Sequence, residues 1–430
     1  MKKFYSLLSL ITFFVLFNIT SVFSQATVKT VSSFDSNGTY KIGDQIDLVF
    51  WFSEAITVSG TPRLELETGS SDAFATYQSG SGSAFLTFRY TVSEGESSSD
   101  LAYTSTSALA NNGGSSMLDS GGSAATLTLP AVGSASSLSG AQAFVIDGIK
   151  PTMTITASQG SDGFSSNDST LSLTFTSSES TTTFASGDVT VSGGTLSSFS
   201  GSGTTYTATF TPTGGEGAKT IDVAAQTYKD AAGNDNSAAS QFNWTYDTTA
   251  PTVSGVDSST NAGTYIPADA ISIQVAFTEA VTVTGTPQLT LETGASDAVV
   301  DYASGSGSTT LTFTYTVGAG HASADLDYAS TSALALNGGT IKDAAGNAAT
   351  LTLATPGAAG SLGANEALVL DTTAPTVSGV SSTTNAGTYK ADDAISIQVL
   401  FDDTVTVTGT PQLTLETGSS DAVVNYASGS

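Results

Sequence analysis

Carboxylates recur at corresponding places along this 430-residue chain, and they are the residues best suited to chemistry. One follows an early strand-like run in each repeat, a second lies in a turn-like segment, and a third lies at a junction shortly before a proline. In that order, the three sets are Glu54, Glu179, Glu279 and Asp403; Asp119, Asp230 and Asp343; and Asp147, Asp247 and Asp371. Calcium takes about six to eight oxygen ligands from carboxylates, asparagine side chains and backbone carbonyls. If strand end, turn and junction converge, a calcium ion would neutralise the acids and lock neighbouring units together.

Two copies of the turn sequence Asp-Ala-Ala-Gly-Asn add asparagine oxygens to this pattern. The predicted metal ligands are Glu179, Asp230, Asn234, Asp247, Glu279, Asp343, Asn347 and Asp371. The first repeat departs from the pattern, because Asp119 begins Asp-Ser-Gly-Gly-Ser and the following junction reads DGIKP rather than DTTAP. One alternative stays open: Asp and Asn also accept local backbone hydrogen bonds, so these residues could be turn formers without any metal.

The composition excludes most enzyme classes. Charged residues make up 11% of the chain, with 11 basic and 38 acidic residues and a net charge of -27. The chain has no cysteine and one histidine, which excludes disulfides, thiolate zinc sites, a cysteine nucleophile and multi-histidine metal centres. Such an acidic protein repels phosphate backbones and anionic lipids, so nucleic acid and membrane surfaces are not expected partners.

The remaining candidates for catalysis or ligand stacking are weak. His321 lies in a loop whose counterpart in the first repeat carries Glu96, so we expect an exposed loop histidine with no catalytic role. Tyr228, Trp244 and Trp51 lie in strand-like runs, and we expect them in the core rather than as platforms for sugars. We find no phosphate-binding loop, nucleophile elbow or zinc spacing, and the chain is predicted not to be an enzyme.

The N-terminus has the features of a secretion signal. Lys2 and Lys3 precede an apolar run of about 14 residues and a small-residue site near Ser24. A membrane span needs about 20 apolar residues, so no membrane insertion is expected. The sequence predicts a signal peptide over residues 1–24 and a secreted or cell-surface protein.

One long module occurs three times. The stretch from Gly263 containing TPQLTLETGASDAVVDYASGSGS returns 124 residues later from Gly387, and an earlier copy starts at Gly38. A different, shorter unit separates the first two copies. The predicted domains are a long repeat over 25–147, the short unit over 148–247, a second long repeat over 248–371 and the start of a third over 372–430. Because the third copy stops where its sister continues, we expect the chain to be a fragment of a longer protein.

Hydrophobic residues alternate with a period of two, which indicates half-buried β-strands. In the second copy, threonines alternate with the apolar residues Leu311, Phe313, Tyr315 and Val317. In the first copy, polar residues alternate in the same way with Leu86, Phe88, Tyr90 and Val92. Gly, Ser and Asn clusters separate these runs, as expected for turns. Units of this size can bury a two-sheet core unaided. The predicted fold class is all-β, with a string of β-sandwich domains.

The short unit resembles the bacterial Ig-like repeat domains of large surface and adhesin-type proteins. The motifs that carry the resemblance are FTSSES, VTVSGGTLSSFSGSGTTYTATFTPT and YKDAAGNDNSAASQFNWTYDTTAP, in that order. The long copies resemble modules that alternate with such domains. The resemblance implies tandem Ig-like β-sandwich domains in an elongated array. Such an array would form an extracellular, multi-domain stalk, often stiffened by calcium.

Two classes of function follow from these observations. The first is a non-enzymatic structural stalk or adhesin segment whose partners are the neighbouring repeats of the same chain. The alternative is a module that binds a surface glycan or protein through loops at the sandwich ends, or that carries a catalytic domain beyond residue 430. A ligand site should leave one copy with an aromatic or polar cluster that its sisters lack, and the sequence shows little of that.

Overall fold

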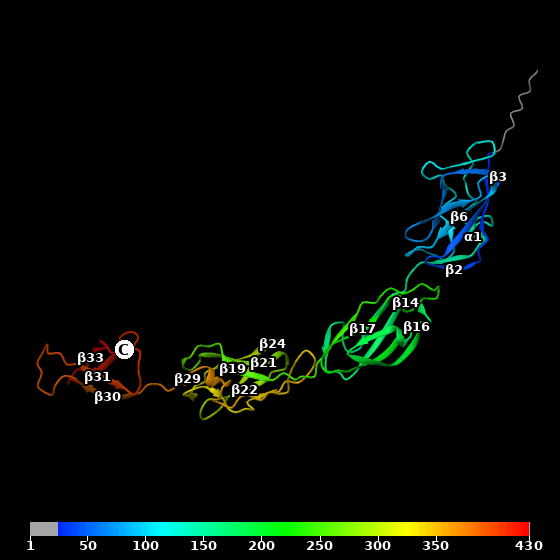
Figure 1. The fold of residues 1–430 in the computed structure, drawn as a ribbon. Helices are drawn as coiled ribbons and strands as arrows, with labels where there is room; N and C mark the ends of the chain where they lie inside the picture. The colour runs from blue at the N-terminus through cyan, green and yellow to red at the C-terminus, as the bar shows by residue number, and fades with distance from the viewer. Residues whose placement is uncertain (1–24, 430) are drawn as a thin grey trace, which may run out of the picture. The chain divides into compact units, whose positions relative to one another are not determined.

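The structure, a computed structural model, describes residues 25–429. The predicted signal peptide lies outside the described residues. Regular structure in the described range is almost entirely β-strand (Figure 1). The all-β class predicted from the period-two pattern is therefore confirmed. The chain divides into two compact units, Met1–Tyr246 and Asp247–Ser430.

The first unit begins with a long repeat built on two sheets. Its eight-stranded sheet has the order β1-β3-β6-β5-β4-β8, with β9 paired to β4 and β10 paired to β3. These strands are β1 (Val28–Ser33), β3 (Gln45–Ser59), β4 (Arg63–Glu67), β5 (Ala73–Ser79), β6 (Ser83–Thr91), β8 (Ala102–Tyr103), β9 (Leu109–Ala110) and β10 (Ser116–Leu118). The second sheet contains β2 (Gly38–Lys41), β11 (Phe144–Asp147) and β7 (Ser97–Ser98). A short helix, α1 (Leu138–Ala141), begins at Ser137, whose side chain accepts a hydrogen bond from Gly140 N.

The short repeat of the first unit has seven strands in two sheets. One sheet has the order β12-β14-β16 and the other the order β13-β18-β17-β15. The strands are β12 (Met153–Ala157), β13 (Phe164–Ser166), β14 (Leu171–Thr181), β15 (Val189–Ser192), β16 (Gly194–Pro212), β17 (Gly217–Val223) and β18 (Phe242–Tyr246), with a 3₁₀ turn at Ser186–Asp188. Trp244, Tyr228, Phe175 and Phe210 are buried in its core.

The second unit repeats the topology of the first long repeat strand for strand. Its large sheet has the order β19-β21-β24-β23-β22-β26, with β27 on β22 and β28 on β21, and its small sheet is β20-β29-β25. The elements are β19 (Val253–Ser258), β20 (Gly263–Tyr265), β21 (Ala270–Thr284), β22 (Gln288–Glu292), β23 (Ala298–Ser304), β24 (Ser308–Thr316), β25 (Ala322–Ser323), β26 (Asp327–Tyr328), β27 (Leu334–Ala335), β28 (Thr340–Lys342), α2 (Leu362–Asn365) and β29 (Leu368–Asp371). Two hairpins follow, β30 (Val377–Ser382) with β31 (Ile397–Phe401) and β32 (Gln412–Leu415) with β33 (Ala422–Asn425).

The alternation read from the sequence appears as alternating burial. In β6, Leu86, Phe88 and Tyr90 are buried, and in β24 Leu311, Phe313 and Tyr315 are buried in the same phase. Each large apolar side chain taken from water stabilises the fold by about 1.5–3 kcal/mol. Three separate clusters of buried residues result, drawn from residues 26–146, 153–244 and 256–370.

Glycines set the tight end of one hairpin in each long repeat. Gly80 lies between β5 and β6 with a φ of +108°, and Gly305 lies between β23 and β24 with a φ of +109°. A Cβ atom at either position would lie 2.1 Å from a backbone oxygen, that of Phe85 or Thr310. Only glycine fits there, so the same turn fixes the same strand register in both repeats.

Candidate metal centres

Three carboxylates meet at the start of the short repeat. They belong to Asp147, Glu179 and Asp230, and one oxygen from each lies within 4.8 Å of the others. Asp147 is the last residue of β11 and Glu179 lies near the end of β14. The register Met153 to Ser177 in the β12–β14 pair brings the chain before β12 alongside Glu179, and a bridge from Thr181 to Asp230 adds the turn.

Asn234 holds this group together through hydrogen bonds. Its side-chain nitrogen donates to Asp230 Oδ2 at 2.9 Å and to the Asp147 carbonyl oxygen at 2.8 Å. Its side-chain oxygen accepts from Ile42 N at 2.9 Å. Asp230 Oδ1 accepts from the backbone nitrogens of Gly233 and Asn234. The side-chain nitrogen of Asn234 therefore positions the two aspartates, and its side-chain oxygen is occupied by the hydrogen bond from Ile42 N.

A second group of three acids with the same asparagine hydrogen bonds occurs in the second unit. One oxygen from each of Asp247, Glu279 and Asp343 lies within 4.8 Å of the others. Glu279 lies on β21, and Asp343 follows β28 directly. The Asn347 side-chain nitrogen donates to Asp343 Oδ2 at 2.9 Å and to the Asp247 carbonyl oxygen at 3.0 Å. Two different repeat types thus build the same arrangement from a junction, a strand and a turn.

The first group is electrostatically unfavourable without a counter-ion. Burial, and then the charges of Asp147 and Asp230, raise the pKa of Glu179. Burial also raises the pKa of Asp147, an effect opposed by the hydrogen bond from Ile149 N and increased by Asp230. The four ion pairs found among residues 25–429 involve none of these three acids. Like charges held together in this way favour a bound cation.

The structure shows which junction aspartate joins each group of three acids. Each group uses the junction aspartate that precedes its repeat, so Asp147, which is not among the predicted ligands, joins Glu179 and Asp230, while Asp247 joins Glu279 and Asp343. Asp371, a predicted ligand, belongs to neither group; its Oδ1 accepts from Thr373 N at 3.0 Å. Asp147 and Asp247 make the same turn, with Ile149 N and Thr249 N. This shared hydrogen bond is what a turn-forming role alone would also require.

The first long repeat has only part of the arrangement within the described residues. Glu54 and Asp119 occupy the strand and turn positions, but no third acid joins them. The Ser120 hydroxyl donates to Glu54 Oε2 instead. Ser123 stands where the second long repeat has Asn347, and its backbone nitrogen donates to Asp119 Oδ1 at 2.8 Å. The same turn therefore closes here without a cluster of three acids.

The middle repeat has a match among known protein families. Residues 147–246 match the bacterial Ig-like domain. This match confirms the resemblance seen in the sequence of the short unit. The Asp147, Glu179 and Asp230 group lies wholly within the matched range of this Ig-like domain. The Asp247, Glu279 and Asp343 group lies outside it.

Comparisons over the whole chain add little to this assignment. A crystal structure of a "Putative membrane anchored protein" from Corynebacterium diphtheriae is 10% identical, covering 77% of this chain and 91% of that one, with a TM-score of 0.18. A TM-score this low carries no argument about the present chain. No curated protein matches the sequence. Among the described residues, no helix has the length and apolarity needed to cross a membrane.

Two expectations about aromatic and histidine side chains need correction. Tyr228 and Trp244 are buried as predicted, but Trp51 is 50% exposed, because its strand neighbours Phe50 and Phe52 take the inward positions. His321 is half-buried rather than exposed. Its ring stacks on Tyr315, with Nδ1 at 2.6 Å from the Tyr315 hydroxyl. Sequence reasoning missed the exposed position of Trp51, although its counterpart in the second long repeat is Ala276.

Proposed function

We propose that this chain is a non-enzymatic, extracellular segment of a bacterial surface repeat protein, in which Ig-like units follow one another as a structural stalk that binds calcium. One observation carries the proposal. The same three-acid arrangement, held by the same asparagine hydrogen bonds, recurs in two repeat types of different length. A structural device repeated in series fits a stalk, whereas an active site is ordinarily built once.

The donor set fits calcium. Each group offers carboxylate oxygens only, with neither sulfur nor imidazole among the clustered groups, and hard divalent cations prefer such ligands. Asp147, Glu179 and Asp230 would hold one ion, and Asp247, Glu279 and Asp343 a second. A bound ion would supply the positive charge that offsets the repulsion among the three acids.

In the first unit the ion would join two successive repeats. Asp147 ends a strand of the long repeat, whereas Glu179 and Asp230 belong to the short repeat. Asn234 already connects the same two repeats through Ile42 and Asp147. Calcium would add a charged connection to this polar one and restrict motion at the junction.

Thermal unfolding of the full chain in calcium and in chelator tests this proposal. At a tenfold excess over dissociation constants of about 10⁻⁴ to 10⁻³ M, each ion stabilises the bound state by about 1.4 kcal/mol, or about 5 °C for a domain of this size. Glu179→Gln and Glu279→Gln should each remove part of the calcium effect. Neither should destabilise the protein in chelator, because the amide relieves repulsion.

Glu54→Gln is the matched control. Glu54 occupies the equivalent strand position in the first long repeat, where no group of three acids forms among the described residues. This variant should keep the full calcium effect. Equal midpoints in calcium and in chelator for the unaltered chain would leave the aspartates as turn formers and contradict the proposal.

A further inference from the structure

The outward face of strands β3 and β6 in the first long repeat has different side chains from the equivalent face of the second long repeat. On β3 the outward side chains are Asp47, Val49 and Trp51, and on the neighbouring strand β6 they are Arg89, Thr87 and Phe85. The strand register places these side chains in three cross-strand pairs, Asp47 with Arg89, Val49 with Thr87 and Trp51 with Phe85. One end of the face is therefore charged and the other is aromatic.

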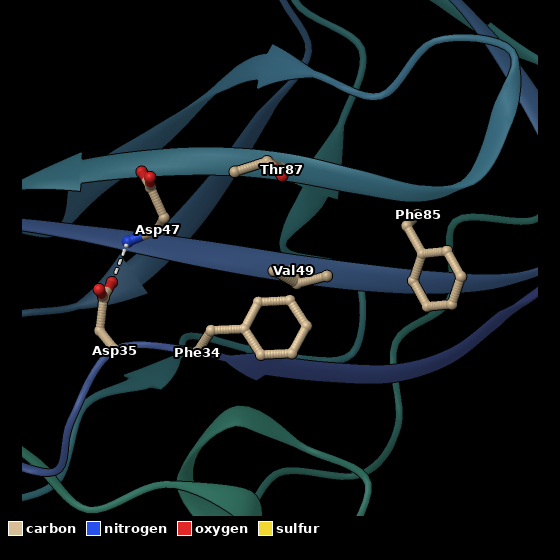
Figure 2. A pocket seen from close by; sticks show the side chains of 6 residues that line it. All are labelled: Phe34, Asp35, Asp47, Val49, Phe85 and Thr87. Carbon is tan, nitrogen blue, oxygen red and sulfur yellow. Dashed lines mark hydrogen bonds between the residues drawn. The ribbon is translucent and has the colours of Figure 1, made fainter.

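The aromatic rings on this face are open to solvent. Phe34 is 92% exposed, Phe85 53% and Trp51 50%. The Trp51 and Phe85 rings stack with centroids 6.0 Å apart and planes 16° apart. Figure 2 shows the rings of Phe34 and Phe85 on either side of Val49. Phe34, Val49 and Phe85 line a shallow hollow of about 410 Å³ together with Asp35, Asp47 and Thr87, and Trp51 lies outside this lining.

The fold does not require these rings. The second long repeat has Ser259, Ala276 and Thr310 at the positions of Phe34, Trp51 and Phe85. Ala276 pairs with Thr310 in the same register as Trp51 with Phe85. Across residues 148–371 of the described chain, no Phe, Tyr or Trp side chain is among the exposed large hydrophobic groups. Exposed aromatic groups that the fold can omit are typical of binding surfaces.

The polar border of the hollow indicates an uncharged ligand. Arg89 donates two hydrogen bonds to Asp47, from Nε to Oδ1 and from Nη2 to Oδ2, both at 2.7 Å. Asp35 Oδ2 accepts from Asp47 N at 2.7 Å (Figure 2). Arg89 pairs with Asp47, so the only net charge left on this border is that of Asp35, and no group of three acids that would hold a cation lies here among the described residues. An anionic ligand would meet a chain with a net charge of -27.

We propose that the face formed by Phe34, Trp51 and Phe85 binds a neutral polysaccharide. The C–H bonds of a sugar ring carry slight positive charge and pack against the negative face of an aromatic ring. The stacked pair Trp51 and Phe85 offers a flat surface for one such face. Remaining lone pairs of Asp35 and Asp47, and the Thr87 hydroxyl, accept from sugar hydroxyls at the rim. This site is independent of the calcium groups and goes beyond a purely structural stalk.

Native gel electrophoresis of the full chain tests the site. The gels contain a soluble β-glucan, a soluble α-glucan or a mannan as neutral probes, with alginate as an acidic comparison. At least one neutral probe should retard the unaltered chain, and alginate should not. The triple variant Phe34→Ser, Trp51→Ala, Phe85→Thr should bind the same probe at least tenfold more weakly. It copies the residues of the second long repeat, so the fold should survive, and its thermal unfolding checks that.

Fluorescence and a reverse graft give independent readouts. The chain has two tryptophans, and Trp244 is buried, so a saturable emission change on adding the retarding polysaccharide reports Trp51. The variant Ser259→Phe, Ala276→Trp, Thr310→Phe should bind more strongly than the unaltered chain in the gel. The proposal is overturned if no neutral probe retards the chain, if the triple variant is retarded equally, or if only alginate binds. Self-association that the triple variant abolishes, without retardation by any probe, would instead make this face a contact between copies of the chain.

Discussion

The two long repeats have the same architecture but differ in their exposed aromatic residues and in their acidic groups. Both order their large sheet in the same way, and each buries a tyrosine whose hydroxyl donates to a backbone carbonyl, Tyr103 to Pro130 and Tyr328 to Ala354. The first has four exposed aromatic rings, those of Phe34, Trp51, Phe74 and Phe85, and, among its described residues, no group of three acids. The second has such a group and no exposed aromatic ring.

The two long repeats share the apolar character of the buried core, and they differ in chemical type at the surface. Inward positions keep their apolar type between the repeats, whereas outward positions such as Trp51 and Ala276 differ in chemical type. Even a partly buried contact tolerates different chemistry: the Tyr90 hydroxyl donates to Glu96, whereas the equivalent Tyr315 hydroxyl is hydrogen-bonded to His321. We infer that the shared core determines the stability of both repeats. The surface residues that differ determine which ligand each repeat can bind.

The largest expected effect tests the shared core. Phe88→Ala and Phe313→Ala each remove a fully buried ring at equivalent positions of β6 and β24, and each should destabilise its own repeat by about 3–5 kcal/mol. Urea unfolding of the full chain measures the change. Phe85→Thr, at the surface of β6, should shift unfolding by less than about 0.5 kcal/mol. A large loss in one repeat and none in the other would show that the two cores are not equivalent.

An intermediate effect is expected where the repeats differ at the acidic turn. Asn347→Ser installs the residue that the first long repeat has at that place and removes the side-chain hydrogen bonds to Asp343 and Asp247. The loss should cost about 1–3 kcal/mol and weaken calcium binding, measured by urea unfolding with and without calcium. The reciprocal control, Ser123→Asn, should change little, because no third acid lies beside Asp119 in the described residues. Equal effects of the two substitutions would show that the asparagine has no special part in the acidic group.

The smallest expected effect concerns pH. Hydrogen bonds from Arg89 lower the pKa of Asp47, so their contribution to stability is present above the ordinary Asp pKa of about 3.9 and is lost as pH falls through the lower folded value. Arg89→Thr copies Thr314 of the second long repeat. It should destabilise the first long repeat slightly at neutral pH and not in strong acid, and salt should reduce the difference. Unfolding midpoints measured across pH decide this, and a difference that grows in acid would contradict the assignment.

Alternation made much of the fold predictable. Leu86, Phe88 and Tyr90 stand between polar residues, so their inward phase could be read directly and is confirmed by their burial. The outward position of Trp51 was harder to recognise. The run Leu48 to Phe52 is continuously apolar and hides the alternation locally, although Asp47 and Ser53, which have the same phase as Trp51, mark the outward side of the strand.

The acidic groups were predictable in residue type but not in partnership. Glu179, Asp230, Glu279 and Asp343 were identified from their recurrence, and each lies in a group of three acids. The junction aspartate of each group depends on how the first strand of a repeat pairs with the strand that carries the glutamate. Those registers, Met153 with Ser177 and Val253 with Phe277, are long-range contacts. For that reason the predicted ligand set contains Asp371 and not Asp147, although both are recognised as junction aspartates.

Equilibrium dialysis against calcium tests the central claim most directly. Two groups of three acids occur in the described chain, so the full chain should bind about two calcium ions at millimolar concentration. Glu179→Gln and Glu279→Gln should each leave about one ion, the double variant should leave none, and Glu54→Gln should leave both. Absence of binding, or the same number of bound ions in the double variant as in the unaltered chain, would contradict the account.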